Sequence, residues 1–168
     1  MHVVPEQEVI ERAQRDKEEG KSPSTQAGEF VREEMHHIRE GKHGAANTKQ
    51  AIAIGLSKAR RAGVGLPQPS GRNTSERTRK QARRDSAKGR QGNRRAPSRR
   101  RSRAVSKALK REGRSAASPA NLSRQAKTAA RRRGAGARKA AARRAVRTKG
   151  SSGLRRSARK AARSRRSR

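Results

Sequence analysis

Several histidine and glutamate residues in the first part of the chain have the spacing of metal ligands on one side of a helix. Positions i, i+3, i+4 and i+7 of this stretch are Glu33, His36, His37 and Glu40, and His43 follows them. Imidazole and carboxylate groups gathered in this way are typical zinc ligands. However, the segment lacks the spacing of known zinc signatures, and polar residues opposite an apolar stripe are typical of a surface helix. We therefore predict a solvated helix face and no metal or other cofactor, with metal binding by these residues as the alternative.

The basic residues indicate a second kind of chemistry, the binding of phosphate groups. Residues 67–168 contain 37 Lys and Arg against three Asp and Glu, and 29 of the 37 are Arg. A solvated helix face would intersperse carboxylates, so this excess predicts a polyanionic partner, and the planar guanidinium fork suits phosphate. We expect the phosphate contacts to come from clustered arginines, namely Arg83, Arg84, Arg94, Arg95, Arg99, Arg100, Arg101, Arg131, Arg132, Arg133, Arg143, Arg144, Arg155 and Arg156.

Other kinds of chemistry find little support in the sequence. The chain has no cysteine, which excludes disulfides, thiolate zinc sites and a cysteine nucleophile. It has no phosphate-binding glycine loop and no nucleophile motif, so we predict that it is not an enzyme and has no small-molecule substrate. A secretory signal would need an apolar run where the acidic residues Glu6, Glu8 and Glu11 stand, and no run is long enough to span a membrane. We expect a cytoplasmic protein without a membrane partner.

Two stretches near the start of the chain have apolar residues at helical spacing. A first helix is expected over residues 5–19, with Gly20 as its stop. A second helix carries Phe30 and Ile38 and ends before Gly41, which suits a left-handed cap. Neither helix is long enough to be stable alone, so each needs a packing partner.

A third helix is predicted to begin at Asn47. With Gln50 three positions later, Asn47 has the pattern of a capping box, and Ile52, Leu56 and Ala59 lie on one stripe of the helix that follows. The short connection before it makes the second and third helices antiparallel neighbours, and the first helix can cover the remaining face. These stretches predict an all-α fold built on a small three-helix module.

The charge and the apolar residues divide the chain into parts. Residues 1–66 carry 11 Lys and Arg against 10 Asp and Glu, which is nearly neutral, and they form the expected helical module. Residues 67–75 are rich in Pro, Ser, Gly and Asn and read as a linker. Residues 76–168 form a basic low-complexity arm with too little apolar surface to offset its ordering entropy. We expect this arm to be mostly disordered and transiently helical, with helix-forming stretches at 104–111, 119–133, 138–147 and 154–163.

An internal repeat connects the module to the arm. The triplet Arg-Glu-Gly that begins at Arg39 recurs at Arg111, and the glycine that closes the segment at Gly63 recurs at Gly134. Residues 111–134 are therefore interpreted as a degenerate basic copy of the module. A weaker echo relates Ala13, Arg15, Asp16 and Gly20 to Ala82, Arg84, Asp85 and Gly89.

The segment GEFVREEMHHIREGKH, followed by QAIAIGLSKARRAG, resembles a small bacterial family of domains of unknown function. The resemblance covers residues 28–63, and residues 50–59 are its specific part. Members of this family often carry Lys- or Arg-rich tails, which implies association with DNA and fixes no biochemical activity. The arm separately resembles the Ala-, Lys- and Arg-rich arms of linker-histone-like bacterial proteins.

Together these features predict a histone-like, nucleoid-associated protein that binds DNA without sequence preference. Phe30 is the one aromatic residue, so the arm offers no platform for base stacking and would contact phosphates. Phosphates do not distinguish DNA from RNA, so an RNA- or ribosome-associated protein is one alternative. An adaptor, whose helical module binds a protein while the arm localises it to nucleic acid, is another.

Overall fold

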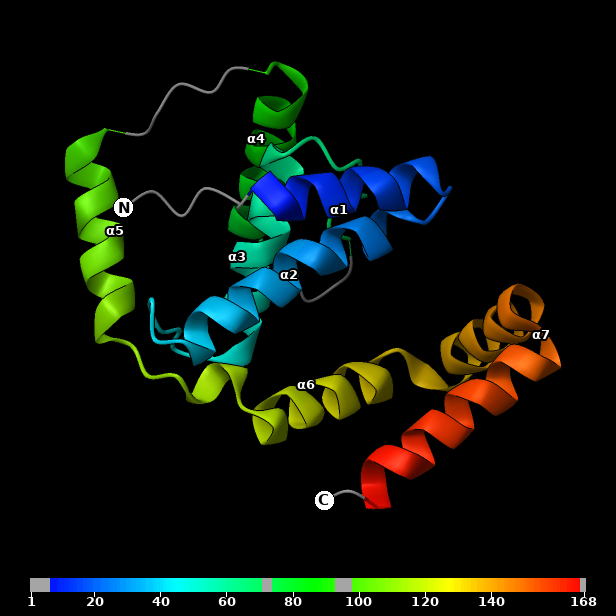
Figure 1. Ribbon diagram of the computed structural model, residues 1–168. Coiled ribbons are helices and arrows are strands. Elements are labelled where there is room, and N and C mark those ends of the chain that lie inside the picture. The colour runs from blue at the N-terminus through cyan, green and yellow to red at the C-terminus, as the bar shows by residue number, and fades with distance from the viewer. Residues whose placement is uncertain (1–6, 71–73, 93–97, 167–168) are drawn as a thin grey trace. The chain divides into compact units, whose positions relative to one another are not determined.

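The structure is a computed structural model that describes residues 7–70, 74–92 and 98–166, and its regular elements are helical throughout these ranges (Figure 1). The predicted all-α class is thereby confirmed. The helices are α1 (Gln7–Glu18), α2 (Pro23–Arg39), α3 (Thr48–Arg61), α4 (Glu76–Arg90), α5 (Arg99–Arg111), the short 3-10 helix η1 (Ser115–Ala117), α6 (Pro119–Arg132) and α7 (Gly134–Arg166).

The three helices predicted for the first part of the chain are all present as α1, α2 and α3. Gly20 and Gly41 follow the first two with φ angles of 70° and 78°, the left-handed conformation expected of a helix stop. At the start of α3, the Asn47 side chain accepts a hydrogen bond of 2.9 Å from the Gln50 amide. The Gln50 side chain in turn accepts from the amide of Ala46 at 2.8 Å, one residue before the position that a regular capping box uses.

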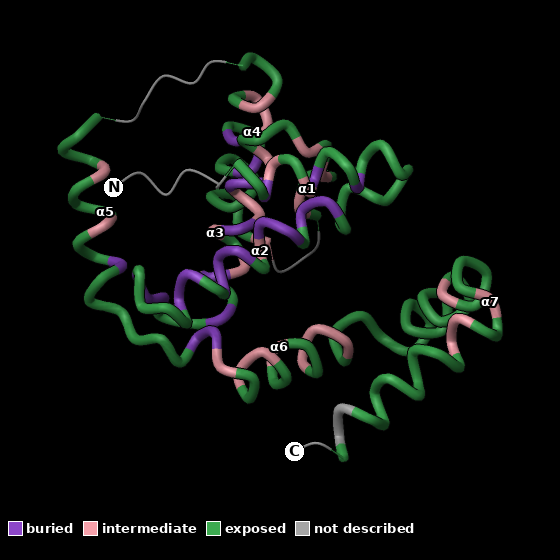
Figure 2. Tube along the Cα trace, viewed as in Figure 1, coloured by how far each residue is buried: buried purple, intermediate pink, exposed green. Residues whose placement is uncertain are grey.

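Helix α2 lies at the centre of this part of the fold and is buried on several sides. Phe30 and Ile38 are fully buried, and they belong to two separate apolar clusters that α2 forms with its neighbours. Figure 2 shows buried residues along α2 and on the sides of α1 and α3 that face it. A helix this extensively covered has no wide solvated face.

The face that α3 presents to α2 is lined by small residues. Ala51, Gly55 and Ala59 are buried, whereas Ile52 and Leu56 of the predicted stripe are only partly buried. A Cβ atom on Gly55 would lie 2.8 Å from the backbone Cα of Val31, so the absence of a side chain lets the two helices approach closely. Ile52 and Leu56 therefore flank the contact between the helices, whereas Ala59 of the predicted stripe lies within it.

Contacts continue beyond residue 66, because α4 packs on α3. Asp85 of α4 is almost fully buried and accepts hydrogen bonds from Ser57 at 2.6 Å and from Arg61 at 2.7 Å. A Cβ atom on Gly89 would collide with the carbonyl oxygen of Arg60, so this end of α4 also lies directly against α3.

The segment around η1 packs on the module where α2 ends and α3 begins, through Arg39 and Thr48. Thr48 donates a hydrogen bond of 2.7 Å to the carbonyl of Ala116, and Arg39 donates one of 2.9 Å to the carbonyl of Ala117. Both alanines are buried in the cluster that contains Ile38. Part of the degenerate copy, residues 111–134, thus packs on the module.

The contacts divide the chain into two compact units, Met1–Leu122 and Ser123–Arg168.

The expectation of a mostly disordered arm is not supported, because α4, α5, α6 and α7 are formed. Apart from Arg133, which follows α6, the stretches predicted to favour helix fall within α5, α6 and α7. Ser118 caps α6 by accepting from the Asn121 amide at 3.2 Å. Composition correctly implied little burial here, since α6 and α7 contain no buried residue among those described. Backbone hydrogen bonds and the high helix propensity of Ala, Lys and Arg form helix without a packed core. Gly150 interrupts α7 with φ 63° and ψ 176°.

Truncation of Ile38 to alanine should lower the free energy of unfolding by about 2 to 5 kcal/mol, because the side chain is fully buried and would leave a cavity. Val105, which is 54% exposed on α5, provides the control, and Val105→Ala should change stability by no more than about 0.5 kcal/mol. Urea denaturation followed by circular dichroism measures both. Equal losses in the two variants would contradict the packing described.

Candidate functional site

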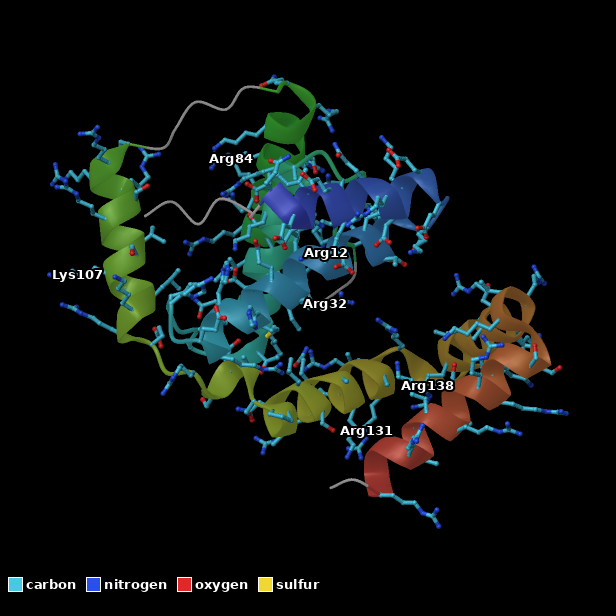
Figure 3. All side chains as sticks on the ribbon, viewed as in Figure 1. Arg12, Arg32, Arg84, Lys107, Arg131 and Arg138 are labelled. Carbon is cyan, nitrogen blue, oxygen red and sulfur yellow. The ribbon has the colours of Figure 1, made fainter. Side chains whose placement is uncertain are left out.

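Basic side chains dominate the surface of the second compact unit. Residues 123–168 contain 19 Lys and Arg and no Asp or Glu. None of the residues whose burial is described between 123 and 166 is buried, and Figure 3 shows basic side chains projecting from α6 and α7, among them Arg131 and Arg138. With no carboxylate side chain in this unit, its positive charge is not neutralised within it.

The predicted phosphate-binding arginines are exposed wherever the structure describes them. They are not gathered into one pocket but are distributed over α4, α5, α6, the residue after α6, and α7. Such a distribution suits an extended polyanion better than a compact ligand. The exposed set is Arg83, Arg84, Arg99, Arg100, Arg101, Arg131, Arg132, Arg133, Arg143, Arg144, Arg155 and Arg156, whereas Arg94 and Arg95 lie outside the described residues.

Charges in the first three helices, by contrast, are largely paired. Arg12 of α1 lies 3.2 Å from Glu29 of α2, and Lys21 lies 2.7 Å from Asp16. These pairs are partly exposed and contribute little to stability individually. Residues 1–66 are close to neutral because their 11 Lys and Arg are matched by 10 Asp and Glu, while the later helices are strongly positive.

Helix α7 has cations around its circumference rather than on one face. Arg138, Arg143, Arg144 and Arg147 advance by about 100° per residue, so they point in several directions. The apolar residue Val146 is 53% exposed and stands without an apolar stripe around it. None of the helices in the described ranges is long and apolar enough to cross a membrane.

The histidine and glutamate residues near the end of α2 do not form the solvated face that was predicted. Glu33 and His37 are buried, and only His36 and Glu40 fit the prediction. The His36 side chain is 66% exposed and lies 2.8 Å from a Glu40 carboxylate oxygen. The prediction failed because it assumed one apolar stripe on α2, whereas α1, α3 and η1 cover this helix from several directions.

A buried polar cluster replaces the predicted face. Ligand atoms of Glu34, His37 and His43 lie within 4.8 Å of one another, and all three residues are buried. Lys58 of α3 completes the cluster, with its Nζ 2.8 Å from Glu34 Oε2 and 3.2 Å from Glu33 Oε2. Sequence analysis missed Glu34 and Lys58. The sequence did contain a signal for the burial of Lys58. Ala51, Gly55 and Ala59 are small residues at helical spacing, and they mark a contact face of α3 beside which Lys58 lies.

Helix α2, its loop and helix α3 are therefore one packed unit, with the polar cluster at its centre. Residues 21–70 match the model of a family of unknown function (DUF6496). The match confirms the resemblance predicted from the sequence. It includes every residue of the polar cluster and ends before α4. No curated protein and no solved structure matches the chain significantly.

The segment that matches the family model and the basic helices are thus separate parts of the sequence. Residues 21–70 supply the central helix and the polar cluster, whereas the predicted phosphate-binding arginines all lie after residue 70. Any nucleic-acid contact made by those arginines would be a property of the region that follows the family match.

Proposed function

We propose that the chain binds nucleic acid, and DNA above all, by contacting phosphates without sequence preference. The observation that carries the proposal is the unit of residues 123–168, with 19 Lys and Arg, no carboxylate side chain and no buried residue among those described. A surface of one charge sign attracts polyanions over distances comparable with the Debye length. The proposal is for a binding protein and assigns no catalytic step.

The spacing of charges on α7 supports contact with a nucleic-acid backbone. Thirteen Lys and Arg lie in the 33 residues of this helix, whose two halves together would extend about 50 Å. One cation thus occurs about every 4 Å of helix, while duplex DNA carries one phosphate about every 1.7 Å along its axis. A phosphate is therefore available for each cation that can reach the backbone. The interruption at Gly150 gives the two halves different directions.

The chemistry of the same surface supports binding without sequence preference. Arginine and lysine on exposed helices can reach phosphate oxygens, which are identical at every base pair. Arginine can also read guanine in the major groove, but this needs a docked helix that holds the side chain in one geometry. Basic residues around the whole circumference of α7 do not select such an orientation. In a bacterial cell, this mode of binding would place the protein in the nucleoid.

Replacing Arg143, Arg144, Arg155 and Arg156 together with glutamine tests the proposal. If each arginine neutralises one phosphate, the log–log dependence of DNA affinity on salt should become shallower by about 3 to 4. The matched control replaces the same four residues with lysine, which keeps the charge but removes the planar fork. The lysine variant should retain the salt dependence of the original chain.

Fluorescence anisotropy with a labelled DNA duplex measures the affinity of both variants. A duplex RNA of the same length tests the alternative that the partner is RNA. Equal affinity of the glutamine variant and the original chain at every salt concentration would contradict binding through α7. Tighter binding of RNA than of DNA would keep the phosphate chemistry and reassign the partner to RNA.

A further inference from the structure

The buried polar cluster brings together residues from α2, from the loop after it and from α3. Glu34 is completely buried, and His37 and His43 are 7% and 8% exposed. Glu34 Oε1 lies 3.4 Å from His43 Nε2, while Glu34 Oε2 faces Lys58. The two oxygens of this carboxylate therefore have different neighbours, and only one of them faces a cation.

The hydrogen bonding of His43 fixes which of its ring nitrogens carries a proton. Nδ1 lies 3.1 Å from the carbonyl oxygen of Gly44. A carbonyl oxygen can only accept, so Nδ1 must donate, and in the neutral imidazole Nε2 then carries a lone pair. That lone pair is directed into the cluster near Glu34 Oε1, which is also an acceptor. Neither atom has a hydrogen-bond partner.

Two acceptors that face each other at 3.4 Å in a buried site need a hydrogen or a metal ion between them, because the separation is too short for a bridging water. Lys58 is the one lysine of the cluster, and its Nζ lies near Glu34 Oε2 and Glu33 Oε2, away from the side on which Glu34 Oε1 meets His43. Although Lys58 is close to Glu34 Oε2, its geometry is not that of a hydrogen bond, so both Glu34 oxygens lack a hydrogen-bond donor. The missing species is either a hydrogen shared by Glu34 and His43 or a metal ion.

We propose that Glu34, His37 and His43 bind a divalent transition-metal ion of the zinc type. Two imidazoles and one carboxylate form a ligand set that favours zinc over magnesium or calcium, which prefer oxygen ligands. A histidine ligand usually donates its other ring N–H to a carbonyl or carboxylate, as His43 does to Gly44.

The distances require a small adjustment when the ion binds. Ligand atoms about 2.0 to 2.2 Å from a tetrahedral zinc ion lie roughly 3.3 to 3.6 Å from one another. Glu34 Oε1 and His43 Nε2, 3.4 Å apart, already have this separation. The ligand atoms of all three residues lie within 4.8 Å of one another. Rotation of one histidine ring would bring the three ligands into range. The fourth position would hold water or hydroxide.

The loop that carries His43 is held from outside by the end of α5 and by the residues between α5 and η1. The amide of Gly44 donates to the carbonyl of Leu109 at 2.9 Å, and the amide of Ala45 donates to Gly113 at 3.1 Å. A Cβ atom on Gly44 would collide with the carbonyl of Glu112, so this packing is close. These contacts place His43 against α2 before any metal arrives, which lowers the entropic cost of binding.

Zinc titration of the full chain, first stripped of metal with a chelator, tests the proposal. The original chain should bind one zinc ion, and its melting midpoint should rise by about 5 to 15 °C when zinc exceeds the Kd by about a hundredfold. Cobalt substituted for zinc should give the absorption of a tetrahedral site. These measurements need no variant, so they decide the question even if a substituted chain does not fold.

The matched variants are His43→Ala and His37→Ala, with His36→Ala as the control. His36 lies on α2 beside His37, but its side chain is exposed and paired with Glu40. The first two variants should lose at least tenfold in zinc affinity and the rise in melting midpoint, while the control should keep both. The proposal is overturned if the original chain takes up no stoichiometric zinc, or if His36→Ala weakens zinc binding as much as His43→Ala.

Discussion

Replacing Lys58 with methionine should lower the free energy of unfolding by about 3 to 5 kcal/mol, measured with a chelator present. The Lys58 side chain is 4% exposed, and its Nζ lies 2.8 Å from Glu34 and 3.2 Å from Glu33, both of which are buried. Methionine keeps much of the volume but removes the charge. The two carboxylates would then remain buried without a cation, and removing one partner of a buried ion pair costs far more than the pair itself contributes.

Lys49→Met is the matched control, because Lys49 lies on the same helix and is exposed. It removes the same charge from α3 and should change the free energy of unfolding by no more than about 0.5 kcal/mol. Denaturation by urea, followed by circular dichroism, compares the two variants. A loss in Lys58→Met no larger than that in Lys49→Met would show that the cluster is solvated, against the packing described.

The parts of the fold that were predictable from the sequence depend on local signals. The Asn47 cap of α3 and the Gly20 and Gly41 stops act within one or two turns of the chain, so spacing alone locates them. The resemblance of residues 28–63 to a family of unknown function was predictable for a similar reason, since it depends on one short segment. The family match to residues 21–70 confirms it.

The polar cluster was not predictable because its burial depends on tertiary contacts. Spacing on α2 grouped His37 with the exposed residues His36 and Glu40, but packing separates them. His37 instead joins Glu34 and a histidine from the loop, whose position depends on a segment near residue 113, far along the sequence. No periodicity within α2 contains this information.

For the basic helices, the packing was partly predictable from the sequence, but the secondary structure was predicted wrongly. Low apolar content predicted that residues 76–168 bury little surface, which holds for the described residues from 123 onward but not for α4 and η1. The inference was also extended from packing to secondary structure. Helix formation depends on backbone hydrogen bonds and on propensity, both of which are favourable for Ala, Lys and Arg. Charge repulsion opposes these terms without reversing them in α6 and α7.

Raising salt from about 50 to about 200 mM should weaken DNA binding about 10⁵-fold if ten phosphates are neutralised. Each phosphate contact releases condensed counterions, so the log–log slope of affinity against salt is about −0.9 per contact and near −9 for ten. The chain has 48 Lys and Arg, of which 37 follow residue 66, so ten contacts use a minority of them. A weak or shallow dependence would require contacts of another kind.

The measurement that tests the central claim most directly is this salt titration, carried out on one DNA duplex and on a duplex of scrambled sequence with the same composition. The account predicts a steep slope, near −9 or steeper, and the same affinity for both duplexes at every salt concentration. A shallow slope, or a preference of tenfold or more for one of the two sequences, would contradict sequence-independent binding through phosphates.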